Sequence, residues 1–254
     1  MIPLKNAAWL LLVVAVSALP QTAKDSGQYL KDAAISETKD VVRITANSPR
    51  PLAQVLEALQ KKYGWIVDYE DPQYTASQDV VEASSNGQRM KYPSGGSFSV
   101  EFPAKSPDEE KTLRLIVDAY NHSKNPGQFE LRRGPEKRFY IVGNAAHDEK
   151  GGIVLQTPPL DVPVTLPGDE RGLTETLDLL CEEITKQSHV DVVIAVSPRS
   201  LLGKTSAKIG GIKVPARELL MQSLAATHHA LYWILLYDPN TKGFFLSIHS
   251  TRPS

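Results

Sequence analysis

The stretch RPLAQVLEALQKKYGWIVDYEDP, residues 50–72, predicts one complete helix followed by one strand. Its apolar residues recur every three or four positions, which is the spacing that places side chains on one face of an α-helix. The residues on that face are Leu52, Val55, Leu56, Leu59 and Tyr63. Prolines mark the helix start, Gly64 marks its end, and the aromatic segment WIVDY (65–69) is typical of a strand. We therefore expect the helix to hold this strand against a core.

A related stretch, VPARELLMQSLAATHHALYWILLYDP, occupies residues 214–239. It shares a proline at the helix start, adjacent apolar residues in the helix, an aromatic strand and a final Asp-Pro. Each half of the chain also repeats one expected order of elements: strand, helix, strand, loop, strand, helix, strand, strand. The sequence therefore predicts an α+β fold of two tandem small modules, each strand-helix-strand-strand-helix-strand-strand. The helices would pack on small mixed sheets, and exposed sheet edges would invite partner strands.

Shifts in composition give the expected boundaries of these modules. The first module covers residues 41–143 and the second covers residues 159–250. The linker between them, residues 144–158, is rich in Gly, Asn and charge and ends at a double proline. Residues 73–96 are rich in Ser, Gly, Gln and Asn, so we expect a long loop there.

The N-terminal segment resembles a secretory signal peptide (1–20), followed by a polar tether (21–40). Lys5 precedes an apolar run at 7–19 that is too short to span a bilayer comfortably. We therefore predict an exported bacterial protein, either periplasmic or secreted. The alternative is an uncleaved anchor, and the protein would then contact the membrane only through this segment.

The composition is ordinary for a globular protein, with 41% hydrophobic and 22% charged residues. The formal net charge of -1 gives no electrostatic reason to expect a nucleic-acid partner. Cys181 is the only cysteine, so the fold must depend on its core rather than on an internal disulfide. Because Cys181 lies on an apolar helical face, we expect a small buried hydrophobe rather than a nucleophile.

Two segments carry a resemblance to a known family: SPRPLAQVLEALQKKYGWIVDYED (48–71) and IKVPARELLMQSLAATHHALYWILLYD (212–238). Their pattern of a proline-led apolar helix and an aromatic strand resembles the short N-terminal domain of secretins and TonB-dependent receptors. It is also similar to the related ring-building modules of secretin periplasmic domains. The resemblance covers most of residues 41–249, as a tandem pair without an outer-membrane barrel, with partner helices at 106–123 and 170–187. It implies a non-catalytic module of the cell envelope that binds a partner protein or a second copy.

Two groups of side chains are candidates for partner contact. Aromatic residues gather on two strands, where successive side chains alternate between faces, so some should be exposed or covered by a partner. These are Trp65, Tyr69, Tyr232 and Trp233. A predicted hairpin is basic and would suit acidic peptidoglycan, anionic lipid or an acidic protein surface, whereas export argues against nucleic acid. Its cations are Arg132, Arg133, Lys137 and Arg138. The alternative is a solvated hairpin whose aromatic residues face the core.

Few residues suggest catalysis. The adjacent His228 and His229 point about 100° apart on a helix, so they would not converge on one metal ion. Near a helix C-terminus, a histidine instead suits the helix dipole. The segment GKTS (203–206) lacks the first glycine of a phosphate-binding loop.

The acidic cluster of Asp68, Glu70 and Asp71 follows a strand and could bind Ca²⁺ weakly, but a solvated strand end is the simpler interpretation. We therefore predict no catalytic residue, no metal and no cofactor, and a partner that is an envelope protein or a second copy. One alternative is a metal-dependent hydrolase that uses His228, His229 and His249. Another is a glycan or small-ligand binding protein that uses the loops at 73–96 and 197–207.

Overall fold

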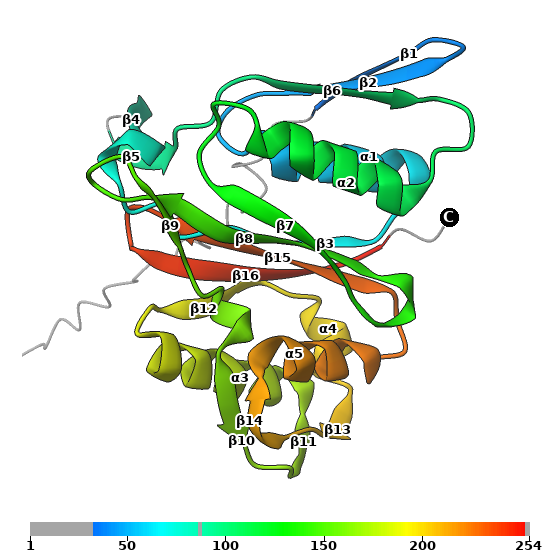
Figure 1. The fold of residues 1–254 in the computed structure, drawn as a ribbon. Coiled ribbons are helices and arrows are strands. Elements are labelled where there is room, and N and C mark those ends of the chain that lie inside the picture. The colour runs from blue at the N-terminus through cyan, green and yellow to red at the C-terminus, as the bar shows by residue number, and fades with distance from the viewer. Residues whose placement is uncertain (1–32, 86–87, 252–254) are drawn as a thin grey trace, which may run out of the picture.

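The computed structural model of the protein describes residues 33–85 and 88–251 (Figure 1). The predicted signal peptide (1–20) and most of the predicted tether (21–40) lie outside the described residues. Within the described ranges, no helix is long and apolar enough to cross a membrane. The described chain is a mixed α+β fold, as the sequence predicted.

The centre of the molecule is a mixed sheet of seven strands that come from both halves of the chain (Figure 1). Six strands run in the order β12-β16-β15-β3-β8-β7, and β9 pairs with β8. From the first half come β3 (Val67–Glu70), β7 (Gln128–Arg133), β8 (Phe139–His147) and β9 (Ile153–Leu155). From the second half come β12 (Val192–Val196), β15 (Leu231–Asp238) and β16 (Gly243–Ser250).

Two helices of the first half, α1 and α2, cover one face of the central sheet (Figure 1). They are α1 (Pro51–Tyr63) and α2 (Glu109–Asn121). A three-stranded antiparallel sheet packs on their other side, formed by β1 (Ala34–Glu37), β2 (Val41–Ala46) and β6 (Phe98–Pro103). Leu52, Val55 and Leu59 on the predicted face of α1 are fully buried in this layer, so the apolar spacing identified the packing face correctly.

The helices of the second half cover the opposite face of the central sheet (Figure 1). They are α3 (Leu173–Ser188), the short α4 (Arg199–Leu202) and α5 (Ala216–Ala225). Two small antiparallel pairs accompany them: β10 (Pro163–Leu166) with β14 (Gly211–Pro215), and β11 (Glu170–Gly172) with β13 (Ser206–Lys208). Cys181 of α3 is buried in this core, as predicted, and burial raises the pKa of its thiol to about 12.

Four segments that the sequence predicted as irregular contain regular structure. The expected loop at 197–207 holds the short helix α4 and the start of β13. The expected loop at 73–96 holds the hairpin of β4 (Val80–Ser85) and β5 (Gln88–Pro93) after the 3₁₀ turn η2 (Ser77–Asp79). The expected linker at 144–158 contains the end of β8 and all of β9, and the expected tether contains β1. Strands β1 and β9 are exposed along their whole length, so they lack the buried alternation that reveals a strand in a sequence. The remaining 3₁₀ turns are η3 (Pro135–Lys137) and η4 (Pro159–Asp161).

Each half of the chain contributes the same pattern of three strands to the central sheet. In the first half, β8 runs parallel to β3 and antiparallel to β7. In the second half, β16 runs parallel to β12 and antiparallel to β15. A smaller antiparallel pair also recurs, β2 with β6 and β10 with β14. By this pattern β3 corresponds to β12, β8 to β16 and β7 to β15.

The two groups of three strands are joined in one sheet, where the sequence predicted a small sheet for each module. Strands β3 and β15 pair in parallel, with Tyr69 opposite Ile234 and Glu70 opposite Leu235. We call this pairing the seam. A seam between distant segments leaves no local signal in the sequence, because its two strands lie far apart along the chain.

The two stretches that look alike in sequence occupy different positions in their halves. The first contains α1 and β3, whose counterparts in the second half are α3 and β12. The second contains α5 and β15, whose counterparts in the first half are α2 and β7. The likeness therefore reflects a shared helix–strand pattern, and the two strands are neighbours at the seam rather than equivalent by position.

Candidate functional site

The acidic cluster after the first helix is buried at the seam. Asp68, Glu70 and Asp71 each have no exposed surface. The prediction of a solvated strand end is therefore wrong. The cluster is tolerated inside the protein because each carboxylate is paired with an arginine and receives further hydrogen bonds.

Asp68 is held by one residue from each half of the chain. The Arg138 Nη2 donates to its Oδ1 at 3.0 Å, and the Trp233 backbone N–H donates to the same oxygen at 2.8 Å. Arg138 also donates to the Leu231 carbonyl. Burial raises the pKa of the Asp68 carboxyl, and the bonds from Arg138 and Trp233 oppose that rise. Arg138 thus bridges the two halves.

Glu70 is held almost entirely by the second half. Arg217 of α5 donates from Nη2 to its Oε2 at 2.6 Å, and the Leu160 N–H donates to Oε1 at 3.2 Å. The same Nη2 lies 2.9 Å from Asp161 Oδ1. Burial raises the pKa of the Glu70 carboxyl, and the positive charge of Arg217 opposes that rise.

The Arg217 guanidinium is also enclosed by aromatic rings. It lies 5.4 Å from the ring centre of Tyr140 and 5.3 Å from that of Trp233. Its Nη1 and the Trp233 Nε1 find no hydrogen-bond acceptor among the described residues. Contact with ring faces stabilises a cation that is removed from water.

Asp71 completes the cluster. The Arg50 Nε donates to its Oδ2 at 2.7 Å, and the Tyr69 hydroxyl donates to Oδ1 at the same distance. The Tyr237 N–H of β15 donates to Oδ2 at 3.1 Å, and the Asp71 N–H donates to the Leu235 carbonyl at 2.9 Å. All three acids therefore accept hydrogen bonds from the second half, so the cluster fastens the seam.

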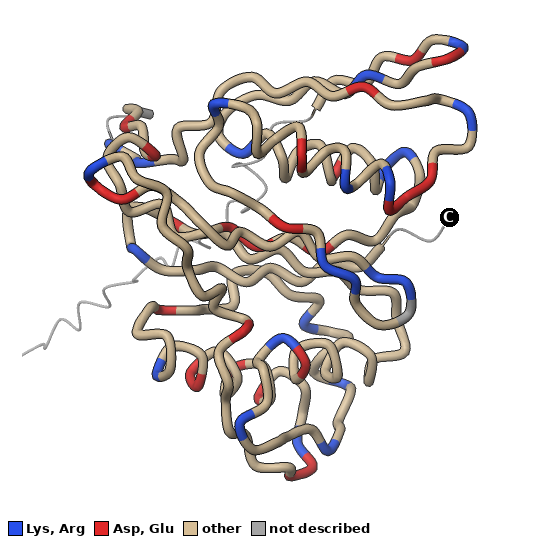
Figure 2. Tube along the Cα trace, viewed as in Figure 1, with Lys and Arg blue, Asp and Glu red and all other residues tan. Residues whose placement is uncertain are grey.

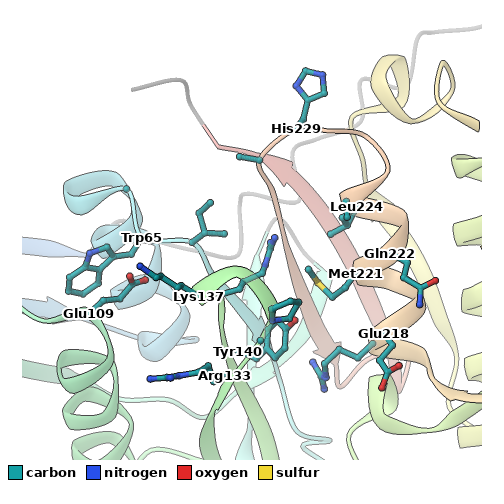
Figure 3. A pocket seen from close by; sticks show the side chains of 18 residues that line it. Trp65, Glu109, Arg133, Lys137, Tyr140, Glu218, Met221, Gln222, Leu224 and His229 are labelled. Carbon is teal, nitrogen blue, oxygen red and sulfur yellow. The ribbon is translucent and has the colours of Figure 1, made fainter. Parts of the chain in front are cut away.

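A groove of about 780 Å³ opens beside this cluster (Figure 3). Its walls are the β7–β8 turn and the segment 64–66 on one side and α5 on the other. Figure 3 shows Trp65 and Lys137 across from Met221 and Leu224 of α5. The groove thus lies between the two halves and combines apolar side chains with charged ones.

The groove is lined by charged side chains of both signs. The side chains that line it include Arg133, Lys137, Arg138 and Arg217 as cations and Glu109 and Glu218 as carboxylates, but no Ser, Thr or Cys. Comparison of the chain with protein families, curated proteins and solved structures finds no match. The function must therefore be argued from the geometry of this protein.

The four predicted aromatic contact residues divide into two pairs. Tyr69 is 2% exposed and Trp233 is fully buried, so neither side chain can touch a partner, and both predictions are wrong. Their strands lie in the middle of a sheet that is covered on both faces. Trp65 is half-buried, lines the groove and stacks on Tyr63 with ring centres 4.9 Å apart. Tyr232 is half-buried and stacks on His249 at 5.1 Å.

The basic hairpin forms as predicted, and Figure 2 shows Lys and Arg gathered at the β7–β8 turn. Two of its cations are structural. Arg138 has a side chain only 15% exposed and pairs with Asp68, and Arg132 pairs with Glu130 and Asp161. Arg133 pairs with Glu110, and both Arg133 and Lys137 are exposed and line the groove. The structure therefore leaves these two, with Trp65, as the predicted residues best placed for a partner.

The predicted histidine alternative gains no support from the arrangement. Among the described residues, no group of three or more His, Cys, Asp or Glu side chains is placed to hold a metal ion. His229 is at the groove, but Figure 3 shows its imidazole pointing away from the other labelled residues. His249 stacks on Tyr232, and burial lowers the pKa of its imidazole.

Arg217 is the most important residue that sequence reasoning missed. It is 7% exposed, and it lies on the buried face of α5 three residues before Leu220 and seven before Leu224. An arginine in register with an apolar stripe was the available signal of a buried ion pair. Its partner Glu70 lies 147 residues away in the chain, so the pair itself could not be predicted.

Proposed function

We propose that this protein is a non-catalytic binding protein of the bacterial cell envelope that docks a partner protein or a second copy of itself. We further propose that it consists of two tandem α+β modules related to the secretin and TonB-dependent receptor domains that its sequence resembles. The matching strand patterns of the two halves support the tandem modules, because a repeated module should repeat its sheet topology. The apolar N-terminal run supports export to the periplasm or beyond.

The groove at the seam is the observation that carries the proposal. Protein-binding surfaces are enriched in aromatic residues, Met and Arg, and the groove presents Trp65, Met221 and Arg133 together. Its two walls come from the two halves, and the buried ion pairs beneath it hold those walls in fixed positions. A preformed surface of this kind loses little conformational entropy when it binds.

Capture from a bacterial envelope extract tests the proposal. The full chain serves as bait, and we expect a specific captured protein, or self-association detected by sedimentation. The variant Trp65→Ala combined with Lys137→Glu should lose a captured partner, because both side chains face the groove. Lys208→Glu, an equal charge change on exposed β13, is the control and should retain it. A strict monomer that captures nothing would contradict the proposal.

A further inference from the structure

The main strand order of the central sheet, apart from the short β9, ends in two outer strands. Among the described residues, β12 at one end and β7 at the other pair with no further strand on their outer sides. The sequence of β12, VVIAV, is entirely apolar, and Val193 is 46% exposed. An unpaired apolar strand is a ready template for another strand, so its exposure calls for an explanation.

The free strand β7 is only partly covered. The Asn121 side chain accepts from the Phe129 N–H at 2.9 Å and donates to the Phe129 carbonyl at 2.7 Å. These two hydrogen bonds occupy the backbone N–H and carbonyl of Phe129, so a partner strand cannot pair with the start of β7. The rest of the strand, from Glu130 to Arg133, is therefore the part of this edge that a partner strand could reach.

These two free strands are the counterparts of the two strands that form the seam. At the seam, β15 pairs in parallel with β3. By the strand pattern of the halves, β7 corresponds to β15 and β12 corresponds to β3. One strand of each corresponding pair therefore lies inside the sheet at the seam, and the other lies at an outer edge.

The geometry of the seam can repeat between molecules. The strands β12 and β3 run in opposite directions, and the helices of the two halves lie on opposite faces of the sheet (Figure 1). A half-turn about an axis across the strands, with a shift of three strands, therefore relates the halves. A second application of this operation places β7 of a neighbouring copy beside β12, parallel to it. Applied twice, this operation does not return a half to its starting position. The interface between copies is therefore head-to-tail.

We propose that this protein associates head to tail through its sheet, with β7 of one copy adding in parallel to β12 of the next. The inference rests on the proposed function, because self-association is one of the two binding modes proposed there. It commits to a second copy as the occupant, since the new interface continues the pattern of the seam.

The pattern also predicts the register of the new pairing. Arg133 of β7 lies opposite Phe139, and Tyr237 of β15 lies opposite Phe244. Arg133 therefore corresponds to Tyr237. Val67 of β3 also lies opposite Phe139, and Val192 of β12 also lies opposite Phe244, so Val67 corresponds to Val192. The seam pairs Ile234 with Tyr69 and Leu235 with Glu70. The corresponding pairs between copies are Glu130 with Ile194 and Leu131 with Ala195.

Side-chain burial agrees with this correspondence. Asp68 and Glu70 are fully buried at the seam, where α5 contributes the cover through Arg217. Their counterparts at the free edge are Val193 and Ala195, which are exposed. The counterpart of α5 is α2, which carries the exposed Leu115. At the seam, the charged Arg217 of α5 covers the charged residues of β3. At the free edge, the apolar Leu115 on α2 of the next copy would cover the apolar residues of β12 in the same way.

Directional cross-linking tests the pairing. Full-length protein with Ala195→Cys is mixed with protein carrying Leu131→Cys under mild oxidation, and we expect disulfide-linked dimers in the mixture but not with either variant alone. Glu130→Cys with Ala195→Cys is the register control, because these side chains would point to opposite faces. Burial raises the pKa of the Cys181 thiol, so it forms little thiolate and should not form disulfides in this experiment. If Leu131→Cys fails to fold, Glu130→Cys with Ile194→Cys tests the same register.

Sedimentation of the purified full chain over a range of concentrations gives a second measurement. Val193→Lys should weaken self-association by about tenfold, because it places a charge on the contact face. Ile212→Lys, which changes an 81% exposed apolar residue on β14, should leave association unchanged. A closed ring or an open filament agrees with the proposal, since both are head-to-tail.

Two outcomes would overturn it. Dimers formed by Ala195→Cys alone would indicate a symmetric β12–β12 contact. A purified chain that stays monomeric at all concentrations would exclude the pairing. If such a monomer still captures an envelope protein, only this inference fails; if it captures nothing, the proposed function fails as well.

Discussion

At the scale of single residues, the seam depends on charges that are buried away from bulk solvent. Asp68, Glu70 and Asp71 are fully buried, and each is paired with an arginine. Removing one partner from a buried ion pair leaves an uncompensated charge, which costs far more than losing a solvent-exposed pair.

Arg138→Met is therefore expected to lower the free energy of unfolding by about 3 kcal/mol. Urea denaturation followed by circular dichroism measures the loss. Arg114→Met removes an exposed i,i+4 pair with Glu110 and should change stability by no more than about 0.5 kcal/mol. The double variant Arg138→Met with Asp68→Asn should recover part of the loss, because the stranded charge is gone. Equal effects of Arg138→Met and Arg114→Met would contradict a buried pair.

His249 gives a pH dependence whose sign can be derived. Burial lowers the pKa of its imidazole below the ordinary 6.5, although Glu57 raises it in part. As the pH falls below about 6.5, the unfolded chain binds this proton before the folded protein does, so stability falls with pH in this window. His249→Phe keeps a ring against Tyr232 and should flatten the profile between pH 6.5 and pH 5, measured by thermal unfolding. A parallel profile for the two proteins would contradict it.

Residue-scale prediction from sequence worked where one element contained the whole signal. The apolar face of α1 was read from spacing alone, because Leu52, Val55 and Leu59 are three or four positions apart. The environment of Asp68 could not be predicted in this way, because its hydrogen-bond donors Arg138 and Trp233 lie 70 and 165 residues further along the chain. Burial of Tyr69 and Trp233 was missed for the same reason.

At the scale of elements, close backbone contacts hold β8 in place. Gly143 of β8 lies against Pro72, and a Cβ there would come within 2.3 Å of the Pro72 nitrogen and Cδ. This contact lets the chain turn after β3 while β8 passes beside it. The first part of β8 was predictable from its apolar pattern, but its continuation to His147 and the need for glycine at 143 were not.

Gly143→Ala should therefore destabilise the protein by about 2 kcal/mol or more, because neither the strand nor the turn has room for a methyl group. Chemical denaturation of the variant measures the change. Gly168→Ala is the matched control, since the nearest atom to its added Cβ is 4.0 Å away. A tolerated Gly143→Ala would show that the turn at Pro72 moves easily.

At the scale of the whole molecule, one sheet and one set of ion pairs join both halves. Tyr140 and Val142 of the first half lie in the core of the second, and Ile234 and Leu236 of the second pack on the core of the first. The order of the longer elements was predictable, because α1, α2, α3, α5 and most strands have local patterns, whereas the short α4 was predicted as a loop. Their arrangement across the seam was not, because it depends on contacts between distant segments.

The protein should consequently unfold as one cooperative unit. In the variant Trp9→Phe combined with Trp65→Phe, Trp233 is the remaining tryptophan, so its fluorescence reports on the second half and the seam. Far-UV circular dichroism reports on the whole chain. We expect the same urea midpoint for both signals. Wild-type protein should show the same coincidence. Separated midpoints would show that the halves unfold independently.

The position of β3 has a consequence for the order in which the chain can mature. The strand follows the first helix, but its neighbour β15 and the ion-pair partner of Glu70 lie far along the chain, with Arg217 147 residues after Glu70. Until those segments emerge, the carboxylates of β3 must stay hydrated, so the first half cannot finish its own interior. Because these contacts can form only after the later segments are made, they would delay folding of the first half. Under the export proposed above, this delay would help to keep the chain unfolded during translocation.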